Sequence, residues 1–479
     1  MCSRPGGLYS HGMEEVQTMR ATTKDAYKLM HDGALALARV EENGMCVDVE
    51  RLDKTIIRVG KRIKKIEVEL KQDDVWRLWK RRFGLKSNFG SRVQLGKVLF
   101  DELGLKSKGK TQLGKRTKVD KDALAGIDLP FVERYQLLER LKKTLSTNLG
   151  GIKKELVGNR LRPSYSLNLV RTYRSSCSNP NGQNFPVRDE EISKMVRSCI
   201  VPTDEDHVLV EIDYGSLEVR IAACYHQDPA MFDYLRDPDK DMHRDAAMDV
   251  FMLSRKEVTK KIRFYAKNQF VFPEFYGSYF KQCAPNLWGA IKQAKLETAD
   301  GVPLKEHLKK KGIRGLGKCD PKEDSKPNTF EAHVQEVERI LWDERFPVYR
   351  NWKKTWFREY EKTGGFDTLT GFRIDGVLVR NDVINYPVQG VAFHCLLWSL
   401  IRLVKWVDKK KLRSKIVGQI HDSIIADVHR DELDDYLRKA KQVMTVDLMK
   451  AWPWIVVPLD VDAELSEKNW FEKQECVIP

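Results

Sequence analysis

The stretches VLVEID, residues 208–213, and KIVGQIHDSIIADV, residues 415–428, decide the fold. In the first, Val208, Val210 and Ile212 alternate with Leu209, Glu211 and Asp213, which predicts a strand that ends on a carboxylate. In the second, two short apolar runs are separated only by His421-Asp422-Ser423, which predicts a hairpin with Asp422 at its tip. Neighbouring strands of one sheet could therefore bring together two carboxylates that are far apart in the chain.

Two carboxylates side by side repel each other unless divalent cations lie between them. A pair of Mg²⁺ ions about 4 Å apart is the common use of such a site in phosphoryl transfer. The alternative is that Asp213 and Asp422 are ordinary turn or cap residues, and for either one alone that alternative is the better interpretation.

A second pattern places cations and aromatic side chains at helical spacing. Arg263 and Lys267 are four residues apart, so on a helix they share a face that could bind a triphosphate. Phe272 and Tyr276 repeat the spacing and could form a stacking surface for a base. Taken alone, the pattern is more often that of a solvated edge above a core stripe.

Composition limits the class of protein. The 479 residues suffice for several domains, and the net charge of +15 suits a polyanionic partner, although a lysine-rich soluble surface would give the same balance. No apolar run approaches the roughly 20 residues that a membrane span needs, so no membrane partner is expected. The nine cysteines are scattered and never spaced as CxxC, which is typical of reduced thiols in the cytoplasm.

The N-terminal third is predicted to be helical, elongated and basic. Apolar residues recur at three- or four-residue steps from Leu52 to Leu70, and Phe131 to Leu145 is helical again. Residues 1 to about 28 show no periodic pattern and are expected to be a loose lead-in. Between the two predicted helices, Lys106 to Lys121 form a basic region. The region from Met231 to Trp406 is largely helical, interrupted by a basic surface excursion at 301–328.

Three segments in order carry a family resemblance. VEIDYGSLEVR (210–220), RFYAKNQFVFPEFYGS (263–278) and QIHDSIIADV (419–428) resemble motifs A, B and C of family A DNA polymerases, the DNA polymerase I type. Further segments resemble other parts of that family: ARVEENGMCVDVERL (38–52), SRVQLGKVLFDELGL (91–105), RLKKTLST (140–147), RSSCSNPNGQNFPVR (174–188), DMHRDAAMDVF (241–251), GGFDTLTGFR (364–373) and INYPVQG (384–390). The resemblance runs from about Leu35 to the C-terminus.

The resemblance implies an α+β protein with the right-hand polymerase fold, in which an antiparallel β-sheet palm is flanked by a helical thumb and helical fingers. The expected division is a lead-in at 1–30, an N-terminal segment and helical thumb at 31–150, the first part of the palm with motif A at 151–230, the fingers with motif B and the basic excursion at 231–345, and the second part of the palm with motif C at 346–479.

The resemblance also implies a metal site. Asp213 would bind both of two Mg²⁺ ions, for which Mn²⁺ can substitute, with the Tyr214 carbonyl assisting and Asp422 completing the site. His243, Arg263 and Lys267 would hold the incoming dNTP, and Lys267 would also donate a proton to the departing pyrophosphate.

Other residues would select the nucleotide and hold the DNA. Glu218 would crowd the sugar 2′ position, Phe272 would lie near the sugar, and Tyr276 with Gly277 would close the pocket at the template base. The residues expected to contact primer-template DNA, five in its minor groove and His421 at the primer end, are Arg174, Asn181, Gln183, Asn385, Gln389 and His421.

The implied reaction is template-directed addition of dNTPs to a primer 3′-hydroxyl by a two-metal mechanism, with release of pyrophosphate. Too few residues precede Leu35 for a proofreading domain, since domains rarely fall below about 50 residues. We therefore expect no 3′–5′ exonuclease on this chain and a possible separate exonuclease or other replisome proteins as partners. The FVFPEFYG variant resembles bacteriophage replicative polymerases, which implies phage DNA replication in the host cytoplasm.

The sequence departs from the family pattern in three places. Motif C usually reads His-Asp-Glu, whereas here Ser423 follows Asp422; we expect an active enzyme in which Asp213→Ala abolishes primer extension and Ser423→Ala does not. Motif B carries one extra residue and Pro273, which predicts a π-bulge near Phe270 that keeps Lys267 and Phe272 on one face. The stretch 279–342 is longer than usual. It carries Lys305, Lys309, Lys310, Lys311, Arg314 and Lys318, which could contact DNA or a partner or form a solvated loop.

Two other functions remain open at this point. A related single-subunit RNA polymerase is disfavoured by Glu218 and by the QNFP and YPVQG segments. A catalytically weakened, polymerase-like DNA-binding protein is disfavoured by the retention of Asp213, Arg263, Lys267 and Tyr276.

Overall fold

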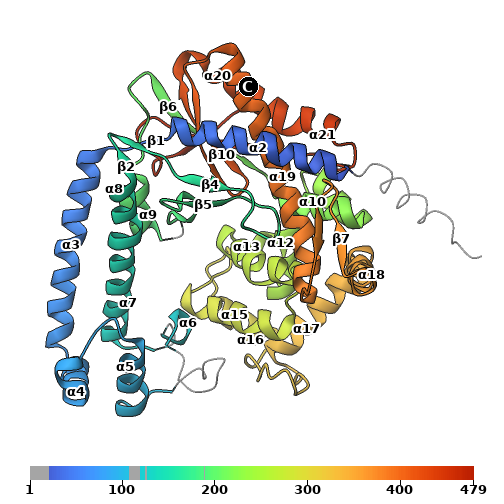
Figure 1. The fold of residues 1–479 in the computed structure, drawn as a ribbon. Helices are drawn as coiled ribbons and strands as arrows, with labels where there is room; N and C mark the ends of the chain where they lie inside the picture. The colour runs from blue at the N-terminus through green and yellow to red at the C-terminus, as the bar shows by residue number, and fades with distance from the viewer. Residues whose placement is uncertain (1–20, 107–118, 125–126, 188) are drawn as a thin grey trace, which may run out of the picture.

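The computed structural model describes residues 21–106, 119–124, 127–187 and 189–479 (Figure 1). Most of the expected lead-in and of the basic region at 106–121 lies outside these residues. The end of the lead-in was predicted wrongly, because helix α2 (Thr23–Asn43) already begins there with a capping box between Thr22 and Asp25. Its buried stripe, from Ala26 through Gly33 to Val40, has helical spacing but consists partly of small residues, which weakened the sequence signal.

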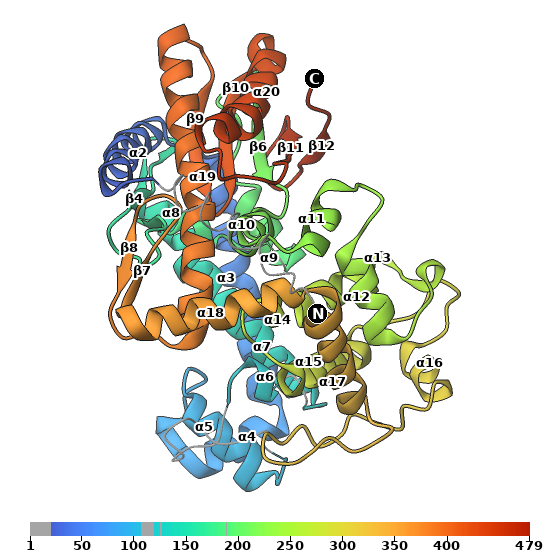
Figure 2. The same cartoon turned by 90° about the vertical axis from the view of Figure 1, so that its right-hand side faces the viewer.

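A five-stranded antiparallel sheet, with the strand order β12-β11-β6-β10-β9, lies at the upper end of the molecule in Figures 1 and 2. The strands are β6 (His207–Tyr214), β9 (Lys415–Ile420), β10 (Ser423–His429), β11 (Val461–Ser466) and β12 (Gln474–Cys476). The predicted strand and the predicted hairpin are thereby confirmed, and they are neighbours in the sheet.

The two faces of β6 have different surroundings. Val208, Val210 and Ile212 belong to the main hydrophobic core, whereas Leu209 belongs to a second core that it shares with the N-terminal helices. Because side chains alternate along a strand, Glu211 and Asp213 share the face of Leu209. The main core thus fixes which face of the sheet presents the carboxylates.

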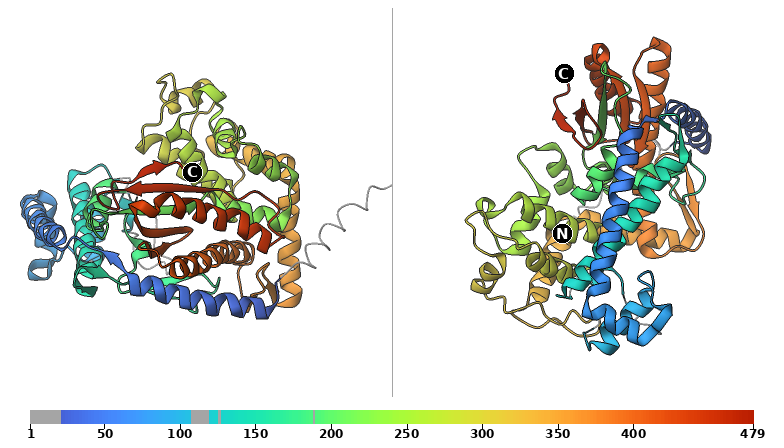
Figure 3. Two further views of the ribbon diagram at one scale, coloured as in Figure 1. Left: turned by 90° about the horizontal axis from the view of Figure 1, so that it is seen from above. Right: turned by 90° about the vertical axis from the view of Figure 1, so that its left-hand side faces the viewer.

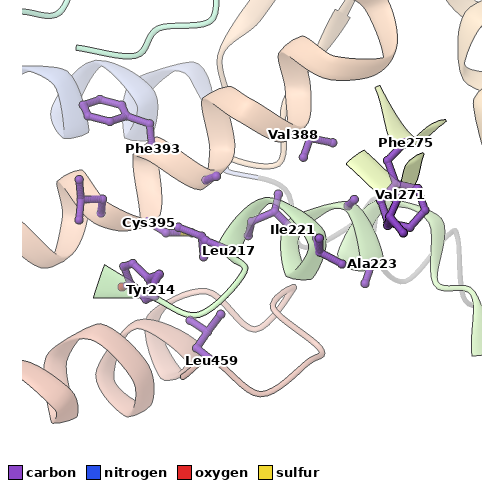
Figure 4. Packing of buried hydrophobic residues seen from close by; sticks show 14 of the residues in the cluster. Tyr214, Leu217, Ile221, Ala223, Val271, Phe275, Val388, Phe393, Cys395 and Leu459 are labelled. Carbon is purple, nitrogen blue, oxygen red and sulfur yellow. The ribbon is translucent and has the colours of Figure 1, made fainter. Parts of the chain in front are cut away.

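Helix α19 (Arg380–Lys410) is the central support of the sheet. It packs against α2, β10 and α10 (Leu217–His226). Figure 4 shows Leu217 and Ile221 of α10 among the same buried side chains as Val388 and Cys395 of α19. By length and composition α19 alone among the described helices could cross a membrane, but 78% of its apolar window is buried inside the protein, as expected of a core helix.

The N-terminal helices form an arm beside the sheet. Helix α3 (Val49–Gln72) packs along α7 (Pro130–Lys143), as Figures 1 and 3 show, which confirms both predicted helices. Aromatic side chains around the fully buried Trp79 pack together at the far end of the arm. The remaining elements of this arm are α4 (Asp74–Phe83), η1 (Gly84–Lys86), α5 (Arg92–Gly96), η2 (Lys97–Glu102), α6 (Lys121–Leu124), η3 (Thr144–Leu149) and α8 (Gly150–Glu155).

A helical group follows the first part of the sheet (Figure 2). It contains α11 (Pro229–Arg236), α12 (Met242–Phe251), η5 (Arg255–Glu257), α13 (Lys260–Ala266), η6 (Lys267–Val271), α14 (Phe272–Phe275), α15 (Phe280–Gln293), α16 (Leu304–Lys310), α17 (Phe330–Arg339), η7 (Ile340–Arg345) and α18 (Pro347–Thr363). The excursion at 301–328 is anchored rather than loose, because Leu304, Leu308 and Ile313 are buried while its lysines are exposed.

Short strands and helices complete the described fold. They are β1 (Met45–Cys46), β2 (Leu156–Val157), β3 (Arg160–Leu161), β4 (Ser164–Ser166), β5 (Ser176–Ser178), η4 (Gly182–Asn184), α9 (Glu190–Arg197), β7 (Gly365–Asp367), β8 (Arg373–Asp375), η8 (Arg430–Glu432), α20 (Leu433–Lys441), η9 (Gln442–Asp447) and α21 (Leu448–Ala451). The expected domain boundary at 150 falls within the continuous helix formed by η3 and α8, and the one at 230 falls within α11. The residues at which palm, thumb and fingers begin and end therefore remain predictions.

Candidate active site

Asp213 and Asp422 meet at one end of the sheet. Asp213 lies directly opposite Ser423, the residue after Asp422, and the Tyr214 amide donates a hydrogen bond to the Asp422 carbonyl over 3.4 Å. Although Asp213 is accessible to solvent, desolvation by the surrounding protein and the charge of Asp422 raise its pKa to about 7. Burial likewise raises the pKa of Asp422. Two carboxylates that resist ionising together form a site prepared for positive charge.

The donor set at this point fits Mg²⁺. Among the described residues, no group of three or more His, Cys, Asp or Glu side chains has the arrangement to hold a metal ion, and the carboxylates that meet at this point are those of Asp213 and Asp422. Mg²⁺ characteristically binds one or two protein carboxylates and keeps water or substrate phosphates as its other ligands. The Tyr214 phenol is buried and donates to the Met444 carbonyl over 2.8 Å, which leaves only the main chain of Tyr214 for a metal.

The predicted π-bulge is confirmed and defines a second surface of the site. Residues Lys267–Val271 form a π-helical segment between α13 and α14, and Pro273 follows in the first turn of α14. The Lys267 ammonium lies 5.0 Å from the centre of the Phe272 ring. The extra residue of motif B is thus absorbed, and Lys267 and Phe272 share one face.

This face carries positive charge that its own surroundings only partly neutralise. Arg263 Nε donates to Asp241 over 2.5 Å, and the ring of His243 meets Phe272 edge-on at 5.6 Å. Burial, and next the charges of Lys267 and Arg263, lower the pKa of His243 to about 4, so this histidine is neutral at pH 7. Burial and the neighbouring Arg263 lower the pKa of Lys267, with Asp213 and Asp422 close enough to oppose the shift.

Glu218, in the first turn of α10, connects that helix to the end of the π-containing helix. Its carboxylate accepts a hydrogen bond from the Tyr276 hydroxyl and another from Arg174 over 3.3 Å. The Asn385 amide donates to the Tyr276 carbonyl over 3.1 Å, which fixes the same residue from α19. Gly277 has a φ of +90°, and a Cβ there would lie 2.3 Å from Asn381 Oδ1, so the turn after Tyr276 requires glycine.

Most residues expected to contact DNA line one cavity of about 600 Å³ beside the carboxylates. Its lining includes Arg174, Gln183, Gln389 and His421. The other two, Asn181, which is exposed just before η4, and Asn385 on α19, do not line this cavity.

Three neighbouring residues were not singled out from the sequence. Asp241 caps α12 through the His243 and Arg244 amides while it pairs with Arg263. Gln419 accepts from Gln183 over 2.9 Å. Glu211, two residues before Asp213, could have been found from the alternation of the strand, which puts both on one face.

Glu211 lies in a polar cluster next to the aspartates. Its Oε1 accepts from the Ser423 hydroxyl over 3.1 Å, and its Oε2 accepts from Trp470 Nε1 over 2.8 Å and from Lys473 over 2.6 Å. Burial tends to raise the pKa of Glu211, but Lys473 and the hydrogen bonds outweigh it, so the pKa lies below its usual value. Glu211 is therefore an ionised group at pH 7.

Comparisons with known proteins agree with this arrangement. The model of DNA polymerase family A matches residues 50–299 and 342–472, and the unmatched stretch between them falls within the expected insertion at 279–342. The chain is 28% identical over 420 residues to the DNA polymerase of Bacillus phage SP01, which covers 84% of this chain and 42% of that protein. It is 26% identical over 442 residues to DNA polymerase I of Bacillus subtilis, covering 92% of this chain and 45% of the relative.

The chain thus spans less than half the length of these relatives. Among solved structures, the fold resembles the POL domain of Pol1 from M. smegmatis in complex with DNA primer-template and dNTP, with a TM-score of 0.71 and 22% identity over 92% of this chain and 70% of that one. This likeness confirms the expected α+β polymerase fold. Because the family model covers most of the residues, the chain belongs to DNA polymerase family A.

Proposed function

We propose that this protein is a template-directed DNA polymerase that adds dNTPs to a primer 3′-hydroxyl and releases pyrophosphate. The observation that carries the proposal is the meeting of Asp213, near the end of β6, and Asp422, in the turn before the adjoining strand β10, close to the cationic face of Arg263 and Lys267. Carboxylates that can hold divalent cations beside cations that can hold phosphates are the two parts that nucleotidyl transfer needs.

Asp213 and Asp422, with the Tyr214 carbonyl, would hold two Mg²⁺ ions, or Mn²⁺ in their place. When bound, the ions lower the pKa of the attacking hydroxyl and neutralise charge on the phosphates. Arg263, freed in part from Asp241, and the neutral His243 would bind the phosphates of the dNTP. Lys267, whose pKa is lowered, is suited to give its proton to the departing pyrophosphate.

The same helix would test the shape of the new base pair. Phe272 would lie near the sugar and Tyr276 at the template base, while Glu218 would occupy the space that a 2′-hydroxyl needs. Arg174, Gln183, Asn385, Gln389 and His421 would hold the primer-template, with Asn181 at the edge of this surface. Catalysis would consist mainly of positioning and charge neutralisation.

The net charge of +15 supports primer-template DNA as the partner, and the phage relative supports a role in phage DNA replication in the host cytoplasm. The exposed lysines of the 301–328 excursion provide a further surface for DNA or for another replication protein.

The test is extension of a labelled primer on a DNA template with Mg²⁺, supplied with dNTPs or with NTPs. We expect extension with dNTPs, little with NTPs and complete loss in Asp213→Ala, whereas Ser423→Ala should not abolish extension at saturating Mg²⁺. Preference for NTPs would identify an RNA polymerase instead. Tight DNA binding without extension would identify a binding protein, and equal loss in both variants would show that the roles are assigned wrongly.

A further inference from the structure

The hairpin tip of this chain lacks the glutamate of the family pattern, and a glutamate lies one strand away. Ser423 follows Asp422 and lies directly opposite Asp213, while Glu211 precedes Asp213 by two residues on the same strand. Directly opposed residues and residues two apart on a strand point to the same face of a sheet. Ser423, Asp213 and Glu211 therefore share the face that carries the candidate metal site.

The Ser423 hydroxyl links the two strands. It has one proton and two acceptors within reach, Glu211 Oε1 at 3.1 Å and the Ile420 carbonyl at 3.0 Å. A carboxylate is the stronger acceptor of the two, so the proton points to Glu211. The oxygen of Ser423 then keeps lone pairs that can accept a hydrogen bond from a water molecule beside Asp213.

Glu211 is held in place by groups from the C-terminal segment. Trp470 and Lys473 both donate to its Oε2, which leaves Oε1 to Ser423. Lys473 also pairs with Glu464, which is opposite Glu211 on β11. Lys473 thus lies between two carboxylates, and the buried Arg197 is close enough to interact with the charge of both.

We propose that Glu211, acting through Ser423, replaces the missing motif C glutamate as the third acidic group of the metal site. Glu211 is a positioning residue: its carboxylate orients the Ser423 hydroxyl, which orients a metal-bound water, and its charge adds to the field of Asp213 and Asp422. The inference rests on the proposed function. It assigns to the neighbouring strand β6 the acidic group that the family pattern has in the hairpin.

The first experiment replaces the charge but keeps the shape. Mn²⁺ binding to the full chain is measured by electron paramagnetic resonance, with a dideoxy-terminated primer-template and the next dNTP bound. We expect Glu211→Gln to raise the Mn²⁺ dissociation constant by about tenfold or more, the usual range for groups that orient metal ligands. The Mg²⁺ concentration for half-maximal primer extension should rise in parallel.

A matched control removes the same charge from the same row of the sheet. Glu475 on β12 is opposite Glu464, two strands from Glu211 and about 10 Å away at ordinary strand spacing. Glu475→Gln should leave the Mn²⁺ dissociation constant unchanged. Melting temperatures without metal show whether each variant folds.

The second experiment moves the carboxylate back to the hairpin. In the double variant Glu211→Ala/Ser423→Glu, the smaller side chain at 211 leaves room for the larger one at 423. We expect this exchange to restore most of the Mn²⁺ affinity that Glu211→Ala alone loses, a rescue that a purely structural role of Glu211 would not produce.

The proposal would be overturned by a folded Glu211→Gln variant with wild-type Mn²⁺ affinity and Mg²⁺ dependence. An equal loss in Glu475→Gln would also overturn it, because the effect would then be one of general charge. Failure of the proposed function has a different signature, namely a wild-type chain that does not extend primers, or an Asp213→Ala variant that does.

Discussion

Glu218 is the residue at which several parts of the site depend on one another. Its carboxylate accepts from Tyr276 and from Arg174, so the group proposed to exclude a 2′-hydroxyl also fixes the aromatic ring proposed to close on the template base. Sugar selection and base-pair closure would therefore be mechanically connected in this chain.

The proposed exclusion can be separated from that connection by two substitutions. We predict that Glu218→Ala lowers the preference for dNTPs over NTPs by about tenfold or more, equivalent to at least about 1.4 kcal/mol of lost discrimination. Tyr276→Phe removes the same hydrogen bond but leaves the carboxylate, so it should retain the preference. The measurement is the ratio of kcat/KM for a dNTP to that for the matching NTP; an unchanged ratio in Glu218→Ala would contradict the assignment.

Some residues of the site could be predicted from the sequence and others could not. Asp213 and Asp422 follow from the alternation of one strand and the tip of one hairpin. The contacts of Ser423 with Glu211 and of Gln183 with Gln419 depend on strand register and on segments distant in the chain. Local patterns carry no information about such pairings.

At the scale of single elements, the helix that carries motif B shows how one extra residue is tolerated. The π-helical turn Lys267–Val271 absorbs it and directly precedes the turn that contains Pro273. This element was predictable because the number of residues between Lys267 and Phe272 and the cost of a proline inside a helix are both local properties of the sequence. The start of α2 was not predictable, because the buried face of this helix includes small residues that give a weak apolar pattern. What buries them is the packing of α2 on α19.

Deleting one residue from this helix should preserve or destroy dNTP incorporation, depending on where the residue is removed. A variant that lacks Asn268 and carries Pro273→Ala should form a regular helix in which Arg263, Lys267, Phe272 and Tyr276 still share one face. We predict that its dNTP kcat/KM lies within about tenfold of wild type. Deletion of the exposed Phe264 instead turns Lys267 by about 100° relative to Arg263 and should lower kcat/KM by about 100-fold or more. Similar losses in both variants, measured by single-nucleotide insertion, would contradict the role given to the bulge.

At the scale of the whole molecule, α19 joins the N-terminal helix, the sheet and the helical group. His394 lies fully buried in it, and its Nδ1 is 2.6 Å from the Thr370 hydroxyl. Burial lowers the pKa of His394 from 6.5 to about 3, so the folded protein keeps this ring neutral where the unfolded chain would protonate it.

The lowered pKa gives a predicted pH dependence. The contribution of His394 to stability is fully present above pH 6.5 and is lost as the pH falls from 6.5 towards 3, by about 1.4 kcal/mol per pH unit. Between pH 6 and 4, the free energy of unfolding should therefore fall less steeply with pH in His394→Gln than in wild type. The difference in slope should correspond to about one proton taken up on unfolding. The exposed His31→Gln serves as control, and a variant slope equal to that of wild type would show that His394 is protonated in the fold.

The general architecture was predictable over most of the described chain. From about Leu35 onwards, the motifs that resemble the polymerase family follow one another in the family's order, and each of them lies on helices or strands of the fold. The excursion at 301–328 was predicted only as a surface feature. Its anchoring through Leu304, Leu308 and Ile313 depends on contacts with distant helices, which composition does not reveal.

The proposed function depends above all on Asp213 and Asp422 holding divalent cations together. Its most direct test is anomalous scattering at the manganese edge from crystals of the full chain with dideoxy-terminated primer-template, the next dNTP and Mn²⁺. We expect two Mn²⁺ peaks about 4 Å apart between the two carboxylates and the triphosphate. A nucleotide bound at Arg263 and Lys267 with no ion shared by Asp213 and Asp422 would contradict it.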